Sequence, residues 1–420
     1  MKILLKDISS LITIGGNNER PRRGQSLNDI GEIKNGAMFF DEKIIWIGTT
    51  QEAEKMKANG EFLPDKVISL KGKTVFPGFV DSHTHLVFAG NRSNEFARRI
   101  SGATYQEIAI EGGGIIATVR AVRNSSEDEL FDNAVRYLTN AIRYGTVAIE
   151  IKSGYGLDVE NEIKMLKVID RLAKNFPIEI IPTFLGAHDF PPEYKSNPNE
   201  YVAIICNEMI PRVAELKLAK YCDCFVDKGY YTLQQAEKIF KTALDYGLKL
   251  RLHADELADV GAAGFAARMG AISADHLIFV SDASIEEMQK YGTIATLLPG
   301  TSYFTRLPYA PAKKLIDRGV PVALASDFNP GSCFTENMQI ILSLAVINLG
   351  LNCEQALVAS TINGAHSLEV ANNLGSLEIG KDSTFVVLNC PSYIDLFYHF
   401  GVNHVEQVWI KGKIFCDNFN

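Results

Sequence analysis

The feature of this sequence that most constrains its fold is a regular alternation of short apolar runs with amphipathic stretches. The apolar runs have the length and composition of buried strands, and the stretches between them, such as 126–145 and 159–176, repeat apolar residues at helical spacing. Such repeats predict a parallel sheet that is covered by helices on both faces. The eight predicted strands are residues 74–85, 145–154, 178–188, 221–229, 248–256, 271–278, 293–300 and 320–331.

Eight strand–helix units predict a closed (β/α)8 TIM barrel. An open doubly wound sheet is the alternative, but it usually carries a glycine-rich phosphate-binding fingerprint after its first strand, and residues 81–90 do not match one. The three glycines at 112–114 lack the spacing of a phosphate loop and do not follow a strand. We interpret them as a loop over the mouth of the barrel that could act as a lid.

The two ends of the chain differ from its middle. Residues 1–74 and 375–420 contain short β-type runs that are broken by polar turns. We therefore predict a small β-sandwich domain built from both termini, with the catalytic barrel between them in residues 75–374. Residues 16–32 are polar, charged and rich in helix and strand breakers, so we expect a surface loop or a disordered segment there.

Composition excludes several classes of protein. The chain has 420 residues, of which 46% are hydrophobic, and a net charge of -8, which fits a soluble globular protein without a basic face for nucleic acid. The first residues do not have the pattern of a secretory signal, so we expect none, and no uncharged apolar run reaches the ~20 residues that a membrane span needs. The seven scattered cysteines, an odd number, predict reduced thiols in the cytoplasm.

Polar side chains gather where the predicted strands end. In an α/β barrel the carboxyl ends of the strands form the active site. Five of the eight histidines and one aspartate lie at such ends. They are His83 and His85 on the first strand, His188 on the third, His253 on the fifth, His276 on the sixth and Asp327 on the eighth.

Four of these side chains predict a metal site. His83 and His85 are two residues apart, so on a strand they point to the same side, although such a pair alone is weak evidence. With His253 and Asp327 they would supply three imidazoles and a carboxylate, and a position would stay open for water, as in catalytic sites. A bound divalent metal lowers the pKa of water from 15.7 to about 7, and Asp327 could accept the proton.

Four further residues near the strand ends have both a structural and a functional interpretation. Glu256 could cap a helix or shuttle protons, and His276 could be a core histidine or could polarise a carbonyl group. Arg92 could be solvated, or it could hold a substrate carboxylate through two parallel hydrogen bonds. Tyr155 lies between glycines that let the backbone approach a ligand.

The chain resembles the amidohydrolase superfamily almost from end to end. The matching stretches are "PGFVDSHTHLVFAGNR", "GATYQEIAIEGGGI", "EIKSGYGL", "FLGAHDFPPEY", "LHADEL", "SADHL", "YAPAKKLID" and "SDFNPGSCFTENM". The resemblance implies one zinc or iron ion, held by His83, His85, His253 and Asp327. It also implies substrate contacts from Arg92, Tyr155, His188, Glu256, Asn329, Gly331 and Ser332, and catalytic roles for Glu256, His276 and Asp327.

Within that superfamily the chain resembles the enzymes that hydrolyse 4-imidazolone-5-propanoate to N-formimidoyl-L-glutamate in histidine degradation. The partner would be this small molecule, without nucleic acid or membrane, and a homodimer stays open. Many relatives bind two metals through a modified lysine after the fourth strand, where Lys228 lies, but the resemblance implies one metal. The alternatives are an aminohydrolase that deaminates a nucleobase-like ring, and a barrel without catalytic activity.

Overall fold

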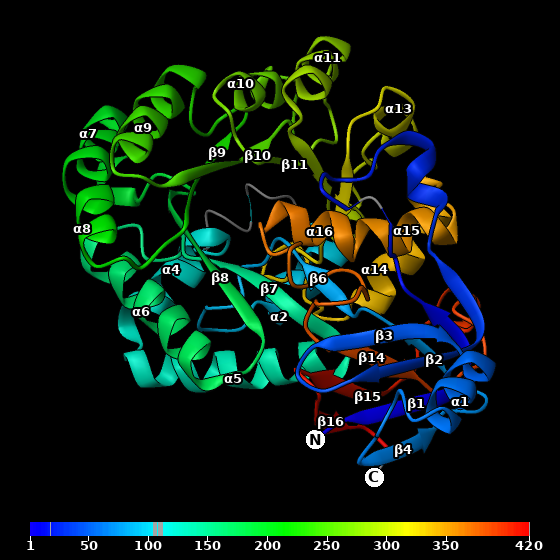
Figure 1. Ribbon diagram of the computed structural model, residues 1–420. Helices are drawn as coiled ribbons and strands as arrows, with labels where there is room; N and C mark the ends of the chain where they lie inside the picture. Colours follow the sequence, from blue (N-terminus) through cyan, green and yellow to red (C-terminus); the bar gives the residue numbers. More distant parts are fainter. Residues whose placement is uncertain (17, 104–106, 108–111, 420) are drawn as a thin grey trace.

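The computed structural model of this chain describes residues 1–16, 18–103, 107 and 112–419, and two sheets organise it (Figure 1). The larger sheet contains eight parallel strands in sequence order, which confirms the predicted barrel. Its strands are β6 (Phe79–Asp81), β7 (Thr146–Lys152), β8 (Glu179–Ala187), β9 (Tyr221–Val226), β10 (Lys249–Ala254), β11 (Ser273–His276), β12 (Ile294–Leu297) and β13 (Val322–Leu324).

The barrel closes just beyond its first and last strands. Thr84 and Phe328 form an isolated parallel bridge. The backbone N–H of Asp327 donates to the carbonyl of His83 over 3.0 Å, and the N–H of His85 donates to the carbonyl of Phe328 over 2.9 Å. The predicted metal ligands His83, His85 and Asp327 therefore lie in the two segments whose pairing closes the barrel.

The prediction of one strand over residues 74–85 is wrong. The segment forms β5 (Thr74–Phe76), which belongs to the smaller sheet, and β6, which belongs to the barrel. Gly78 lies between them with a φ of 83°, a conformation that favours glycine. A Cβ there would also lie 2.7 Å from the side chain of Val147. The chain turns from one sheet into the other at this point.

Helices surround the barrel strands (Figure 1). Several begin at a capping box; Ser126 and Glu129, for example, satisfy each other's backbone N–H groups at the start of α5. The described helices are α1 (Thr50–Ala58), α2 (Ser93–Ile100), α4 (Ile115–Asn124), α5 (Glu127–Arg143), α6 (Val159–Asn175), α7 (Pro198–Ile204), α8 (Ile210–Glu215), α9 (Leu233–Asp245), α10 (Ala262–Arg268), α11 (Asp282–Tyr291), α12 (Pro299–Thr305), α13 (Ala312–Asp317), α14 (Met338–Leu344), α15 (Cys353–Ala359), α16 (Ile362–Ser367) and α17 (Asp395–Tyr398), with short 3-10 turns η1 (Gly24–Asn28) and η2 (Pro192–Tyr194) and π turns η3 (Ile205–Met209) and η4 (Ala345–Leu349).

Both ends of the chain form the smaller, mixed sheet, as predicted. Its strand order is β16-β15-β14-β5-β1-β2-β3, and β4 pairs with β1. The sheet folds over itself, because Phe40 on β2 packs against Phe385 on β14 and Trp409 on β15, with ring centroids 5.3 and 5.8 Å apart. Its strands are β1 (Ile3–Ile12), β2 (Glu32–Phe40), β3 (Ile44–Thr49), β4 (Lys66–Ser69), β5, β14 (Phe385–Leu388), β15 (Val405–Ile410) and β16 (Lys413–Asp417).

Part of the smaller sheet packs into the hydrophobic core of the barrel, while its own interior, with Phe40, Phe385 and Trp409, forms a separate cluster. Val386 and Val405 of the smaller sheet belong to the same buried cluster as Phe79 and Val147 of the barrel. Phe76 and Phe79, on either side of the turn, pack with ring centroids 4.9 Å apart. The division of the chain into domains at 74/75 and 374/375 stays a prediction.

The expectation for residues 16–32 is wrong in one respect. Within this segment η1 forms, and the side chain of Arg22 is buried instead of solvated. Its guanidinium donates to the carbonyls of Ile14 and Gly15, and its backbone N–H donates to Asn363 of α16. Arg22 therefore attaches the segment to the barrel.

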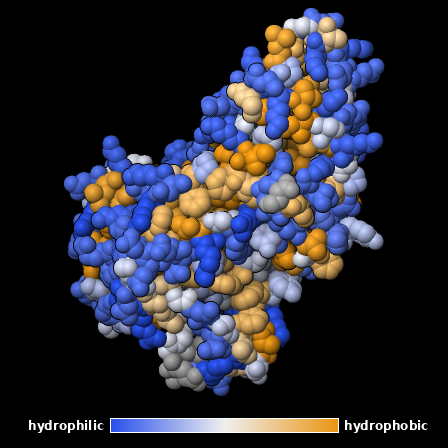
Figure 2. Space-filling view, turned by 90° about the horizontal axis from the view of Figure 1, so that it is seen from below, coloured by the Kyte–Doolittle hydropathy of each residue, from blue (hydrophilic) through white to orange (hydrophobic). Residues whose placement is uncertain are grey.

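Figure 2 shows one face of the molecule, on which hydrophilic residues surround separate hydrophobic patches. Among the described residues, no helix is both long and apolar enough to cross a membrane. All seven cysteines are free, and Cys222 and Cys224 are buried on β9.

Candidate active site

A cavity of about 430 Å³ opens at the carboxyl ends of the barrel strands. All predicted site residues except His83 line this cavity, and His83 is fully buried beside it. The lining also includes eight residues that the sequence did not indicate. These are Glu95, Arg99, Ile115, Phe225, Tyr230, Leu257, Thr305 and Leu307.

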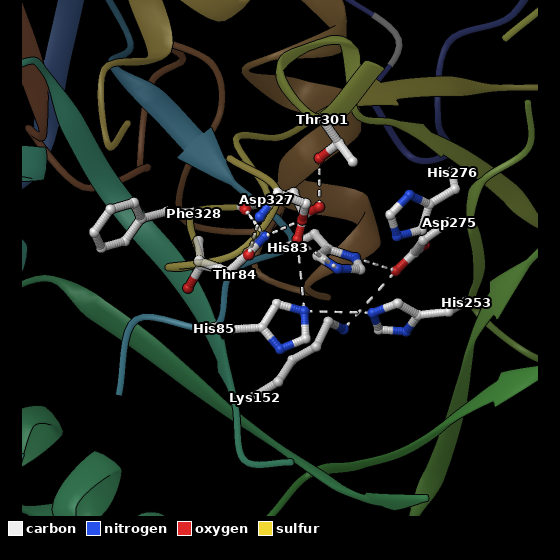
Figure 3. A network of polar contacts seen from close by, with 12 residues as sticks. His83, Thr84, His85, Lys152, His253, Asp275, His276, Thr301, Asp327 and Phe328 are labelled. Carbon is white, nitrogen blue, oxygen red and sulfur yellow. Dashed lines mark hydrogen bonds and ion pairs between the residues drawn. The ribbon is translucent and has the colours of Figure 1, made fainter. Parts of the chain in front are cut away.

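The predicted metal ligands meet at one end of the cavity (Figure 3). Nε2 of His85 lies 3.4 Å from Nε2 of His253. Oδ1 of Asp327 lies 3.5 Å from Nε2 of His85 and 3.6 Å from Nε2 of His83. Potential ligand atoms of the three histidines all lie within 4.8 Å of one another.

These distances and donor types fit a metal ion. Ligand atoms at 2.0–2.1 Å from a tetrahedral zinc are separated by about 3.4 Å. Nε2 of His83 is buried and has no hydrogen-bond partner among the described residues, a costly arrangement unless a ligand binds it. Burial lowers the pKa of His83 and of His85 well below the ordinary value, so both imidazoles are neutral, the form that binds metal.

Two buried carboxylates orient the histidines. Nδ1 of His83 donates a hydrogen bond to Asp275 over 2.7 Å. Nδ1 of His253 lies 3.0 Å from Asp223. Because each carboxylate occupies the Nδ1 side of its ring, Nε2 is the nitrogen that faces the cluster.

Lys152 lies below the histidine cluster and contacts the carboxylates that surround it (Figure 3). Its Nζ lies 2.8 Å from Asp223, 2.8 Å from Glu150 and 3.8 Å from Asp275, and all four side chains are fully buried. Burial alone would lower the pKa of Lys152, but Asp223 and Glu150 raise it above its ordinary value. Lys152 is therefore a cation at neutral pH. By contrast, Lys228 is exposed and is not among the lining residues, so it does not reach the described site.

Asp327 adopts a backbone conformation that few aspartates use, with a φ of 52°. The hydroxyl of Thr301 donates to its Oδ2, which leaves Oδ1 toward His83 and His85. Burial raises the pKa of Asp327 to about 6, although the Thr301 hydrogen bond opposes this. Strained backbone at a buried polar residue is typical of functional sites.

Glu256 and His276 are neighbours in the lining of the cavity, with Oε2 of Glu256 3.6 Å from Nδ1 of His276. Burial, and then the charges of Asp327 and Asp227, raise the pKa of Glu256 to about 8. The pKa of His276 is lowered well below its ordinary value, chiefly by burial. At neutral pH the pair is therefore a protonated carboxyl group and a neutral imidazole. The carboxylate of Asp227 accepts hydrogen bonds from the backbone N–H groups of Glu256 and Leu257, which fixes the loop after β10 that carries Glu256.

Tyr155 and His188 form the next part of the wall. Glu162 accepts hydrogen bonds from the backbone of Gly154 and Gly156, which holds the loop that carries Tyr155. Nδ1 of His188 donates to the carbonyl of Gly154 over 3.0 Å, and burial lowers the His188 pKa to about 3. The His188 ring stacks on His85, with centroids 4.9 Å apart.

Arg92 is paired within the protein. Its guanidinium forms two hydrogen bonds with Glu95, one of them at 3.0 Å. Glu95 also accepts from the backbone N–H of Gly114, which ties the glycines at 112–114 to the cavity wall. Whether this loop closes over a substrate stays a prediction.

A turn after β13 completes the wall. Oδ1 of Asn329 accepts from the backbone N–H groups of Gly331 and Ser332, and its Nδ2 donates to the hydroxyl of Ser332. A side chain at Gly331 would collide with the guanidinium of Arg92. The close approach of this turn to Arg92 therefore requires glycine at position 331.

Comparison with known proteins assigns the class. Residues 74–415 match the amidohydrolase family, and the chain belongs to that family. The solved structures that it resembles include a zinc-bound adenosine deaminase from Xanthomonas campestris (TM-score 0.72, 18% identity, 98% of this chain and 92% of the other) and a triazine hydrolase variant (TM-score 0.75, 16% identity, 99% and 95%). At these identities the structures support the fold alone.

The sequence relatives narrow the class. The chain is 43% identical to the imidazolonepropionase of Alkaliphilus metalliredigens, over 99% of this chain and 98% of the relative. It is 42% identical to the imidazolonepropionase of Geobacillus kaustophilus, over 98% of this chain and 97% of the relative. Within the amidohydrolases the chain therefore falls among the imidazolonepropionases.

Proposed function

We propose that this protein hydrolyses 4-imidazolone-5-propanoate to N-formimidoyl-L-glutamate. The observation that carries the proposal is the cavity itself: three imidazoles and a carboxylate converge at one end of it, and Arg92, the predicted partner of the substrate carboxylate, lines its wall. In this reaction water adds to the ring carbonyl carbon, the ring C–N bond breaks, and a proton passes to the departing nitrogen.

His83, His85, His253 and Asp327 would hold one zinc or iron ion per chain. Nitrogen and carboxylate donors suit both metals. When bound, such an ion polarises a carbonyl group and makes water a stronger nucleophile at neutral pH. The prediction of a metal is supported by the fit of the histidine cluster, and the choice between zinc and iron is left to metal analysis.

Two groups, Asp327 and Glu256, would move the protons, and His276 would stabilise the developing charge. Asp327 has one oxygen fixed by Thr301 and the other within the cluster, so it accepts the proton of the attacking water. Glu256, protonated at neutral pH, donates to the departing ring nitrogen. His276 is neutral and adjacent to Glu256, and it stabilises the oxyanion that develops on the carbonyl.

The remaining wall residues would position the substrate. Arg92 and Tyr155 hold the propanoate and His188 contacts the ring, and this fixes the carbonyl at the metal end. A fixed geometry of this kind supplies much of the rate enhancement in hydrolases. Asn329, Gly331 and Ser332 close the opposite side and contact the product.

The proposal is tested by metal analysis combined with an absorbance assay on imidazolone-propanoate. We expect one metal per chain, turnover of the substrate, and loss of both metal and turnover in His253→Ala. Arg92→Ala should lower kcat/KM by more than threefold, because a charge-assisted hydrogen bond contributes about 1.5–3 kcal/mol. A nucleobase-like ring turned over in preference would favour the deaminase alternative. Metal-loaded protein without any turnover would favour the noncatalytic alternative.

A cytoplasmic location, a homodimer, and the absence of a nucleic-acid partner stay predictions. Four large hydrophobic side chains are exposed between residues 394 and 402, and the surface they form is the kind that a homodimer buries. Light scattering decides the oligomeric state. The exposed residues are Ile394, Tyr398, Phe400 and Val402.

A further inference from the structure

A fully buried guanidinium group lies inside the barrel, below the predicted metal ligands. It belongs to Arg251, which precedes His253 on β10 by two residues, so both side chains point into the barrel. We propose that Arg251 is a positioning residue of the metal site: it holds His83 in place and thereby raises the affinity of the site for a metal ion. The inference rests on the metal site of the proposed function. It goes beyond that function because Arg251 is not among the described residues that line the cavity.

Arg251 holds the main chain of His83. Its Nη2 donates a hydrogen bond over 2.9 Å to the carbonyl of Ser82, which belongs to the peptide group that joins Ser82 to His83. β6 ends at Asp81, so this carbonyl lies beyond the regular strand. The carbonyl of His83 itself accepts from the backbone N–H of Asp327 over 3.0 Å. The backbone of this predicted ligand is therefore fixed before and after its Cα atom, once by Arg251 and once by a second predicted ligand.

Arg251 also acts on the His83 ring through a carboxylate. Oδ2 of Asp275 accepts the hydrogen bond from Nδ1 of His83 over 2.7 Å (Figure 3), and Nη2 of Arg251 lies 3.8 Å from the same oxygen. Nε of Arg251 lies 3.2 Å from Oε1 of Glu150, another fully buried carboxylate. The guanidinium therefore helps to keep the charge of Asp275 behind the ring, and Nε2 of His83 stays directed at the cluster.

The guanidinium is in turn held by the last residue of α16. Nη1 donates to the carbonyl of Ser367 over 2.8 Å, and Nη2 donates to the hydroxyl of Ser367 over 3.0 Å. The ring centroid of Tyr221 on β9 lies 5.3 Å from the central carbon of the guanidinium. The five donors of a guanidinium can satisfy Ser82, Ser367 and a carboxylate at once, which the three donors of a lysine ammonium cannot do. The orientation of Arg251 is therefore set by the fold before a metal binds.

A purely structural role of Arg251 leads to a different expectation. Removal of a buried, paired cation destabilises a fold in any case. A structural residue would change the free energy of unfolding but not the metal affinity of the molecules that are folded. A positioning residue changes that affinity, and groups that orient metal-binding histidines typically contribute about 10–100-fold.

The test is a titration of the metal-free protein with zinc ion in competition with a chelator, at a temperature at which circular dichroism shows each variant to be folded. We expect Arg251→Met to weaken zinc binding by about tenfold or more. The visible absorption spectrum of the cobalt(II)-substituted protein should change as well, because the His83 imidazole is no longer held in place. Folded Arg251→Met that binds zinc within about threefold of wild type overturns the proposal.

Two further variants complete the experiment. Arg22→Met is the matched control, because it removes another buried guanidinium that donates to backbone carbonyls, and the described partners of Arg22 lie outside the metal cluster. Its zinc affinity should stay within about twofold of wild type, and a loss as large as that of Arg251→Met would overturn the proposal.

Arg251→Lys keeps the positive charge near Glu150 but cannot make all the contacts of the guanidinium. It should bind zinc about three- to tenfold more weakly than wild type. This variant decides the question if Arg251→Met does not fold, since wild-type zinc affinity in Arg251→Lys then overturns the proposal.

The outcomes separate this inference from the proposed function. Wild-type protein that binds zinc and hydrolyses imidazolone-propanoate, together with undiminished zinc affinity in Arg251→Met, contradicts the role of Arg251 alone. Wild-type protein that binds neither zinc nor iron contradicts the metal site of the proposed function, and this inference with it.

Discussion

At the scale of single residues, Lys152 explains how three acidic groups can be buried beneath the metal ligands. Asp223 contacts both Lys152 and His253, and Asp275 contacts His83. The carboxylates that orient the metal ligands are therefore part of the same buried charge network as Lys152. Removal of one member of a buried charge network leaves the others uncompensated.

We predict that Lys152→Met destabilises the metal-free protein by about 3–5 kcal/mol, measured by urea unfolding, because Asp223 would remain buried without this cation and Glu150 would keep only Arg251, 3.2 Å away. Lys174→Met is the control, since the Lys174–Asp170 pair is exposed and should contribute less than about 0.5 kcal/mol. Equal stability of the two variants would contradict the structural role of Lys152.

Glu256 gives the site a pH dependence that can be measured without metal. Its pKa is raised to about 8 from an ordinary 4.5, so the folded state binds the proton more tightly than the unfolded chain does. Its contribution to stability is complete below about pH 4.5 and is lost as the pH rises through about 8. Relative to Glu256→Gln, the wild type should lose roughly 2–4 kcal/mol between pH 5 and pH 8.5 in urea unfolding. A pH-independent difference would contradict the shift.

The sequence indicated some of these residues and not others. Histidines at strand ends stand out because a barrel collects such ends at one face. Lys152 lies inside the apolar run 146–152, and only the folded barrel shows which acids surround it. Lys228 was considered as a bridge between two metals because it follows the fourth strand. In the structure β9 ends at Val226, and Lys228 is exposed to solvent. Arg99 lies on α2, away from any predicted strand end.

At the scale of elements, the eight barrel strands were predictable from apolar runs of the right length. The break between β5 and β6 was missed because both halves are apolar and fully buried, so hydrophobicity does not separate them. The distinction lies in the partners: β5 pairs with β1 and β14, and β6 pairs with β7. Pairing between distant strands is not encoded in local periodicity.

We predict that Gly78→Ala destabilises the protein by about 2–4 kcal/mol, because the new Cβ would combine a positive φ with a close approach to Val147. Gly60→Ala is a matched control: its φ is 79°, but no atom lies within 4 Å of the new Cβ, so about 1 kcal/mol is expected. Urea unfolding measures both. A similar cost for both variants would mean that the contact with Val147 contributes nothing.

At the scale of the whole molecule, the packing of Val386 and Val405 into the barrel core predicts that the two sheets unfold together. Both tryptophans, Trp46 on β3 and Trp409 on β15, lie in the smaller sheet, whereas most helices surround the barrel. Unfolding followed by tryptophan fluorescence should therefore coincide with unfolding followed by helical circular dichroism. Two separate transitions would mean that the sheet and the barrel are independent folding units.

The pairing of β5 with β14 has a consequence for synthesis. The N-terminal strands leave the ribosome first, but the neighbour of Thr74–Phe76 is Phe385–Leu388, more than three hundred residues later. Throughout most of translation the edge of the early sheet is therefore bare, and a bare edge can pair with another nascent chain. Slow translation or premature termination before β14 should accordingly yield aggregates. The exposure ends only when β14, near the end of the chain, pairs with β5.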